Sequence, residues 1–592
     1  MEQKRLFLAI GISVAILMIF QIIMPRPQQR PHPATQAAVT DNAAPATPTE
    51  HAPLPSNTVG ATPSDAGVAP VPAPANAPRV KIFAPAVQGS ISVLGARLDD
   101  LVLRDYRETI QPDSPLVRLL EPRSDPQPYY IQFGWTGLGD VKVPDPNTTQ
   151  WTASGDELTP GKPVTLSWDN GAGQTFQIAF AIDDHYMFTV QQSVRNTGGE
   201  PVQVFPWSRI RRDYTPQVAG YYILHEGLLG VIDGTLKEMK YSTAKEDGAK
   251  KDGLAYSATT TNSWAGITDK YWLTSLIPDR TEKTVVSFRD TTATVEGKPS
   301  AGYQVDYVAD TPQDIAAGAD ATAMTRVFAG AKVVRLLTDY EDRDKIPLFS
   351  YAVDFGWFYF LTKPFFYAID WLNGLLGNFG LAIMAFTLFV KALFFPLANK
   401  SYRSMSKMKL LAPKMQALKE RYKDEPQKLQ AEMMQLYKTE KVNPASGCLP
   451  MVIQIPVFFS LYKVIFVTIE MRQAPFFGWI HDLSAVDPTN VFNLFGLLPF
   501  DPTAISPWLH LGAWPLIMGC TMFFQQRLNP PPPDPVQARL FQFMPLIFTF
   551  MLARFPAGLV IYWSWNNTLT ILQQWVIMRQ TTLGRARVVR ST

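Results

Sequence analysis

The 592-residue sequence has almost no cysteine and little histidine, with two of the former and six of the latter. Cys448 and Cys520 both lie in apolar runs, so neither a disulfide framework nor a zinc site can be built from them. The charge balance is also nearly even, because the net charge is only +3. Metal chemistry and a nucleic-acid partner are therefore not expected.

Motifs of catalytic chemistry are missing as well. The sequence has no Walker-type phosphate loop, no nucleophile elbow and no paired metal ligands. Its apolar segments hold no serine, aspartate or zinc constellation of an intramembrane protease. They also show no internal repeat of the kind that many transporters carry. We predict a protein that is not an enzyme and that needs no cofactor or nucleotide, with a polytopic solute transporter as the alternative.

The near-neutral mean hydropathy of −0.02 conceals two unlike halves, a water-soluble one before about residue 345 and an apolar one after it. Residues 1–24 place Lys4 and Arg5 before an apolar run that no small-x-small cleavage site follows. They are predicted to be an uncleaved signal-anchor transmembrane helix. Residues 25–79 hold 13 prolines and 13 alanines, which predicts a disordered linker.

Residues 80–340 show the alternation of apolar and polar residues that half-buried strands require. In Thr175–Ile182 every second residue is apolar, and residues 185–194 and 284–288 are further strand candidates. Turn signals at 169–173 and 196–199 separate such segments. Many short strands with Gly/Pro punctuation predict a large antiparallel β-sandwich without a recognisable site.

The apolar half is predicted to be mostly α-helical. Residues 345–377 mix aromatic and charged residues, which is typical of an amphipathic helix in the headgroup plane. We expect transmembrane helix 2 at 378–399, a cytoplasmic helical hairpin at 400–446, transmembrane helices 3–6 within 447–580 and a basic tail at 581–592. With the signal anchor this makes a six-span bundle. The hairpin holds eleven Lys/Arg against five acids, so the positive-inside rule places both termini in the cytoplasm and residues 25–377 outside.

Lys391 is a cation well inside an apolar run, with Thr387 one helical turn before it on the same face. A charge near the bilayer centre costs roughly 2.5–3.5 kcal/mol on insertion scales. Lys391 either faces a hydrated cavity or extends its stem to the headgroups, and its position alone leaves both open. No acidic residue within the predicted spans can pair with it, which favours a cavity. Gln454, Asn566 and other amides can line the same space.

The hairpin carries methionines at helical spacing. Met405, Met408 and Met415 precede a break at 424–426, and Met433 follows it on the same pattern. We favour the interpretation that these residues form the seam between the two hairpin helices. The alternative is a soft contact surface for variable apolar segments, because methionine is unbranched and polarizable.

A family resemblance follows from longer stretches of sequence. The run from Ser401 to Val464, together with APFFGWIHDLSAVDP and FMPLIFTFMLARFPAGLVIYWSWNN, resembles the YidC/Oxa/Alb membrane-protein insertases over essentially all of 345–580. The 80–340 segment, including GITDKYWLTSLIPD, resembles the periplasmic β-sandwich of the Gram-negative bacterial type.

The resemblance implies a membrane protein insertase and chaperone of the bacterial inner membrane. Its hydrophilic groove would open to cytoplasm and lipid, and Lys391, Thr387, Gln454, Trp563 and Asn566 match groove-lining positions. The groove cation is usually arginine in this family, so Lys391 keeps the charge but loses the planar fork. The implied partners are nascent membrane proteins, the lipid bilayer, the Sec translocon (SecYEG with SecDF) and the ribosome.

Overall fold

The computed structural model describes residues 78–218, 224–295, 298–423, 425–440, 449–506, 509–528 and 535–590. The predicted signal anchor, residues 1–24, and nearly all of the predicted linker, residues 25–79, lie outside these ranges. By its contacts the chain divides into one unit of residues 1–56 and 531–544 and another of 57–530 and 545–592. The described part of the first unit is the beginning of one helix, and all contacts given below lie within the second.

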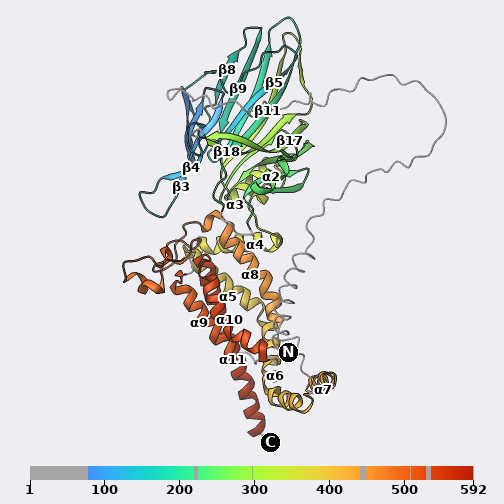
Figure 1. The fold of residues 1–592 in the computed structure, drawn as a ribbon, viewed down its shortest axis with the longest axis vertical. Coiled ribbons are helices and arrows are strands. Elements are labelled where there is room, and N and C mark those ends of the chain that lie inside the picture. Colours follow the sequence, from blue (N-terminus) through green and yellow to red (C-terminus); the bar gives the residue numbers. More distant parts are fainter. Residues whose placement is uncertain are drawn as a thin grey trace, which may run out of the picture. The chain divides into compact units, whose positions relative to one another are not determined.

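The predicted β-sandwich is confirmed (Figure 1). One eleven-stranded sheet has the order β14-β17-β18-β11-β5-β3-β2-β1-β7, with β19 beside β11 and β4 beside β3. Its strands are β1 Arg79–Phe83, β2 Val87–Ser92, β3 Arg97–Arg107, β4 Leu116–Leu120, β5 Tyr129–Leu138, β7 Glu157–Leu158, β11 Val202–Arg212, β14 Leu254–Thr260, β17 Thr284–Val295, β18 Lys298–Ala309 and β19 Gln313–Ile315. Every pairing in it is antiparallel except that of β1 with β7.

The second sheet has nine strands in the order β13-β12-β15-β16-β20-β10-β9-β8-β6. They are β6 Thr152–Ala153, β8 Val164–Asp169, β9 Gln174–Ile182, β10 Met187–Asn196, β12 Gly227–Ile232, β13 Thr235–Lys240, β15 Ser263–Thr268, β16 Trp272–Pro278 and β20 Asp320–Ala331. The expected strands coincide with β9, most of β10 and the start of β17. Aromatic side chains fill the space between the sheets, as when Phe133 of β5 meets Phe180 of β9 at a ring distance of 5.9 Å.

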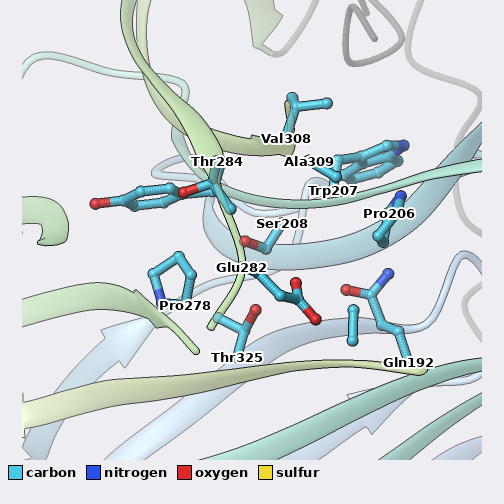
Figure 2. A pocket seen from close by; sticks show the side chains of 12 residues that line it. Gln192, Pro206, Trp207, Ser208, Pro278, Glu282, Thr284, Val308, Ala309 and Thr325 are labelled. Carbon is cyan, nitrogen blue, oxygen red and sulfur yellow. The ribbon is translucent and has the colours of Figure 1, made fainter. Parts of the chain in front are cut away.

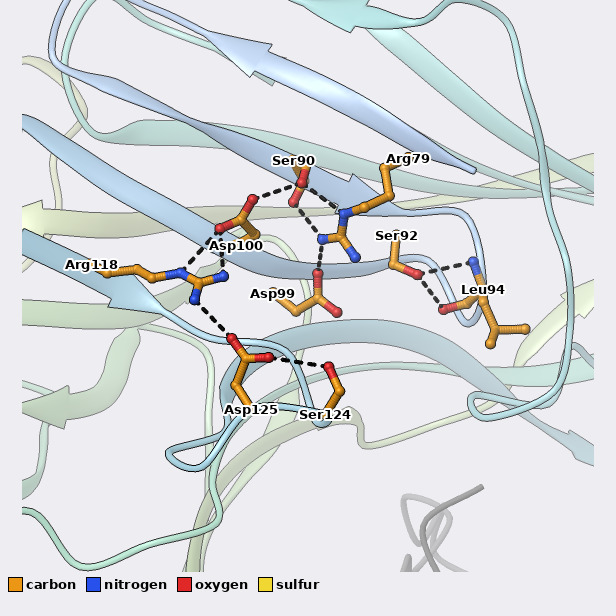
Figure 3. Close-up of polar contacts among 9 residues, drawn as sticks. All are labelled: Arg79, Ser90, Ser92, Leu94, Asp99, Asp100, Arg118, Ser124 and Asp125. Atoms are coloured by element: carbon orange, nitrogen blue, oxygen red, sulfur yellow. Dashed lines mark hydrogen bonds and ion pairs between the residues drawn. The ribbon is translucent and has the colours of Figure 1, made fainter. Parts of the chain in front are cut away.

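Charged side chains bind β1 to β4 together at one end of the first sheet (Figure 3). Arg79 pairs with Asp99, and Arg118 bonds Asp100 at 3.0 Å and Asp125 at 2.7 Å. Arg118 and both its partners are partly exposed, so these two pairs contribute only ~0–1 kcal/mol each. These ion pairs link neighbouring strands at this end of the sheet, and we assign them a structural role rather than a binding or catalytic one.

The rest of the described chain is mainly helical. Its helices are α2 Tyr241–Gly248, α3 Val334–Arg343, α4 Tyr359–Leu376, α5 Phe379–Leu393, α6 Phe395–Arg421, α7 Pro426–Thr439, α8 Leu449–Val467, α9 Ala513–Leu528, α10 Pro535–Leu552 and α11 Ala557–Arg590, with short 3-10 turns such as η4 Val491–Gly496. Among the described residues, no single helix combines the length and hydropathy needed to cross a membrane. One bent pair, Phe379–Leu393 with Phe395–Met405, meets both requirements together.

The bend between α5 and α6 is 67° and falls inside the stretch 378–399, where transmembrane helix 2 was predicted. Phe394 leaves helical geometry with φ −89° and ψ 5°, and Pro396 follows in the first turn of α6. Proline has no backbone N–H, so it cannot bond the carbonyl four residues earlier and the helix breaks before it. The bend places Lys391 in the last turn of α5.

Helix α4 has the two-faced character predicted for residues 345–377, although it begins only at Tyr359. Thr362, Phe366 and Ile369 are buried, whereas Phe360 and Trp371 are 74% and 63% exposed. A helix that buries one apolar face and exposes aromatic residues on the other fits a water–lipid boundary.

The β-domain is joined to the helices by partly buried polar contacts. Asp354 pairs with Lys463 of α8 at 2.9 Å and accepts the backbone N–H of His225 at 3.1 Å. Glu470, just after α8, accepts the N–H of Val334 at the start of α3 at 3.0 Å. These contacts hold the β-sandwich against the end of α8.

Candidate functional site

Lys391 reaches from α5 across to α11. Its Nζ donates to the hydroxyl of Thr570 at 2.9 Å, and that hydroxyl donates to the carbonyl of Asn566 at 2.7 Å. The side chain is half-buried, and in the described part of the chain no carboxylate lies within ion-pair distance of it. The cation is therefore held by a neutral hydroxyl, which leaves its charge uncompensated.

Thr387 does not join this contact. It lies one turn before Lys391 but is buried, and its hydroxyl donates to the carbonyl of Ile383 at 2.7 Å. A threonine that bonds its own helix backbone satisfies its donor locally. Thr387 is therefore a buried residue of α5 that makes no hydrogen bond to Lys391.

Gln454 connects α8 to α11. Its Nε2 donates to the hydroxyl of Tyr562, which is buried, at 2.7 Å. The next residue, Trp563, packs its ring 4.6 Å from that of Phe458 and 6.0 Å from that of Phe548. Gln454 and Trp563 therefore lie at the contact of α8 with α11, where an amide–phenol bond sits beside an aromatic cluster.

Asn566 is buried, and its side-chain oxygen has no hydrogen-bond partner among the described residues. The same holds for the hydroxyl of Ser460 on α8 and for one amide nitrogen of Gln573 on α11. Each buried polar atom without a partner costs about 1–3 kcal/mol, unless water or a ligand bonds it. The unpaired polar atoms thus lie on the helices that carry Lys391, Gln454 and their bonding partners.

Two residues of this arrangement, Thr570 and Tyr562, were not singled out in the sequence. Thr570 follows Asn566 by four residues, so the helical spacing of polar residues on α11 could have found it. The sequence contains no comparable signal for Tyr562, because a tyrosine within an apolar helix is normally predicted to be a core residue.

One of the four hairpin methionines, Met415, contacts the opposite helix of the hairpin. The hydroxyl of Tyr437 on α7 donates to the sulfur of Met415 on α6 at 3.8 Å, and Lys414 pairs with Glu440 at 2.7 Å. Met405, Met408 and Met433 are half-buried. The seam between the hairpin helices therefore includes Met415, and the role of the other three methionines stays a prediction.

Two cavities lie in the described part of the β-domain, and neither resembles this arrangement. One cavity of about 20 Å³ is lined by Ser208, Thr325 and Glu282, whose side chain points into it (Figure 2). Burial, with a smaller contribution from Asp279, raises the pKa of Glu282 to about 7. A cavity of this volume has room for one water molecule and not for a substrate. A cleft of about 660 Å³ elsewhere includes Gln203, whose amide bonds Asp314 in its wall. Among the described residues no cluster could hold a metal ion.

Two family models match the chain. The model of the 60Kd inner membrane protein matches residues 371–584, and that of the YidC periplasmic domain matches residues 79–368. A protein of Granulibacter bethesdensis named membrane protein insertase YidC is 60% identical over 596 residues, which cover 100% of both chains. One of the same name from Acidiphilium cryptum is 57% identical over 85% of each chain. A crystal structure of an active YidC insertase aligns with a TM-score of 0.34 and 18% identity, covering 86% of this chain and 94% of that one.

Proposed function

The chain belongs to the YidC family of membrane protein insertases, and we propose that it works through a polar groove between α5, α8 and α11 with Lys391 as its charged centre. As an insertase of the inner membrane with a periplasmic β-domain, it acts on nascent membrane proteins and catalyses no chemical reaction. The groove would receive the hydrophilic segment of an incoming chain while its apolar segment leaves sideways into lipid.

The observation that carries this proposal is the bond from Lys391 to Thr570 across two helices, made without a carboxylate partner. A lone cation in an apolar bundle is stable only where water or a mobile anion can reach it. The unpaired atoms of Asn566, Ser460 and Gln573 call for the same hydration. A groove with these properties would bind carboxylates and amides weakly and reversibly.

The driving force would come from the substrate. Moving apolar surface from water into lipid releases on the order of 25 cal/mol per Å². The groove would lower the free-energy barrier to insertion, because its polar groups would replace part of the water that the hydrophilic segment loses. It would thus need no nucleotide and no cofactor.

We propose a topology of six spans with both termini in the cytoplasm and residues 25–377 in the periplasm. The cations support this orientation, since the hairpin 400–446 holds eleven of them and residues 473–526 hold none. The basic hairpin also suits contact with the anionic surface of a ribosome. Cooperation with the Sec translocon is proposed from the family alone.

The groove is tested by the access of water to position 391. Lys391→Cys and the control Phe389→Cys, in a background without the two native cysteines, are treated with a membrane-impermeant thiol reagent from the cytoplasmic side. Phe389 lies two residues earlier, on the opposite face of the same helix, and is 63% exposed, where lipid would cover it. We expect labelling at 391 and none at 389. Equal protection of both positions would overturn the proposed groove.

A further inference from the structure

The connection between α8 and α9 carries an exposed apolar surface that the groove does not use. Its most exposed members are Leu497 at 82% and Ile505 at 75%, and Leu494 and Phe495 are each about half exposed. Residues 491–500 read VFNLFGLLPF and contain no charged residue. We refer to residues 491–505 as the apolar loop.

Most backbone donors of the apolar loop are paired within it or with its neck, the residues 487–490 and 511–514 that flank it. The backbone N–H groups paired in this way include those of Val491, Phe492, Phe495, Gly496, Leu497, Leu498 and Phe500. The side chains of Asn490 and Asn493 take part, since they accept from Phe492 and Gly496 at 3.1 and 3.0 Å. A polypeptide segment in lipid must pair its backbone N–H groups internally, because the hydrocarbon contains no water to bond them. A segment in water has no such requirement.

The loop also has a fixed shape. Leu494 and Phe495 both adopt left-handed backbone conformations, with φ 53° and 59°, which bulky residues rarely do. Its neck is held by the buried Asp487, which accepts from the indole of Trp479 at 3.1 Å and from the backbone of Trp514 at 2.9 Å. The strained turn directs apolar side chains outward, while the side chains of Asn490 and Asn493 bond back to the loop backbone and Asp501 stays exposed after the turn.

The loop leaves the helices at the end nearest the β-domain. Arg472, at the start of the same connection, donates to the carbonyl of Arg107 in β3 at 2.5 Å. Phe476 packs against Gly380, where any side chain would collide with its ring, so the connection also touches the start of α5 just beyond α4. The exposed aromatic face of α4 and the apolar loop thus belong to the same end of the bundle.

We propose that the apolar loop inserts into the hydrocarbon edge of the bilayer leaflet on the β-domain side, as a second membrane contact beside α4. A protein partner is a poorer fit, because the asparagines bond the loop's own backbone and Asp501 is the only charged residue between 491 and 505, which is too little for the polar rim of a protein interface. A water-exposed loop is a poorer fit still, since large contiguous apolar surfaces are rare on soluble regions. The inference rests on the membrane location of the bundle and not on the groove.

Two single-cysteine variants of the full chain, in the background without native cysteines, test this contact. Leu497→Cys is compared with Ile110→Cys, which lies between β3 and β4 and is 49% exposed. Both carry an environment-sensitive fluorophore in proteoliposomes that contain no substrate or partner protein. Emission is measured with nitroxide-labelled lipids and, separately, with aqueous iodide present on both sides of the membrane. Ile505→Cys serves as a second loop position if labelling at 497 disturbs folding.

We expect the loop probe to lose most of its emission to the lipid nitroxide and to be shielded from iodide, with the reverse at position 110. Iodide quenching at 497 as strong as at 110 would show a water-exposed loop and overturn the proposal. Protection from both quenchers would show that protein covers the loop, and would overturn it equally. Neither quenching measurement depends on the thiol labelling at position 391. A result that overturns the proposed groove can therefore be distinguished from one that overturns the membrane contact of the apolar loop.

Discussion

Replacing Lys391 with alanine should slow the insertion of substrates whose translocated segment is acidic. A carboxylate about 6 Å from the ammonium gains ~0.7 kcal/mol at the dielectric constant of water and ~3 kcal/mol at an effective value of 20. Since each 1.36 kcal/mol is a factor of ten, the loss lies between about 3-fold in a fully hydrated groove and about 100-fold in a drier one. Thr570, the only bonding partner of Lys391 in the described chain, is neutral, so no internal carboxylate competes with the substrate.

The assay compares two substrates that share one apolar segment and differ only in an acidic or neutral translocated tail. Protease-protected product is followed over time in proteoliposomes. Lys391→Arg should be tolerated, and Lys391→Met separates the loss of charge from the loss of volume. Lys391→Glu should be worst for the acidic tail because like charges repel. Thr570→Val removes the hydrogen bond and keeps the cation, so it should affect both substrates alike.

The reasoning is refuted if the alanine and glutamate variants insert both substrates at the wild-type rate. Lys391 would then only anchor α5 to the headgroups, as its alternative interpretation holds.

Four further predictions concern other parts of the chain. A single cysteine at Gln430 in α7 should react only with a reagent that enters the cytoplasm; labelling from the periplasm would contradict the topology. Deleting most of residues 80–320, while sparing the stretch that leads into 347–377, should leave insertion activity, whereas complete loss at normal protein levels would give the β-domain a direct role. Adding four leucines to α10 should slow insertion, because its apolar Ala538–Leu552 spans only ~22 Å of a ~30 Å hydrocarbon core and a short span thins the bilayer; an unchanged rate would remove that idea. Burial lowers the pKa of Lys332 from 10.5 to about 8. The charged lysine therefore reduces the free energy of unfolding by about 3 kcal/mol below pH 8, and this reduction disappears as the pH rises from 8 to 10.5. Lys332→Met should therefore raise the melting temperature at pH 7 and abolish the rise in stability between pH 8 and 10.5, and a melt that keeps this rise would contradict the assignment.

Local patterns predicted the elements well. Strict alternation located β9 within one residue, and the acidic-proline break at 424–426 separated α6 from α7 where the structure has it. Pro396 also carried the signal for the bend at Phe394, which the apolar character of the run concealed. Such features are readable because their causes lie within a few residues of sequence.

Contacts between distant segments were not predictable in this way. Thr570 is 179 residues from Lys391, and Tyr562 is 108 residues from Gln454. Periodicity shows which face of a helix is polar, but not which helix lies opposite. The seat of the β-domain on Asp354 and Lys463 was missed for the same reason, because an isolated Asp or Lys reads as solvated surface.

Cross-linking at position 391 tests the central claim most directly. A ribosome-bound nascent chain with one cysteine in its acidic segment is oxidised in the presence of Lys391→Cys or of the control Phe389→Cys, which lies on the opposite face of α5. A polar groove between α5, α8 and α11 predicts a disulfide at 391 and little at 389 while the segment is still crossing. Cross-linking at 389 with none at 391 would show that the polar segment crosses along the outer surface of α5, and would contradict the account.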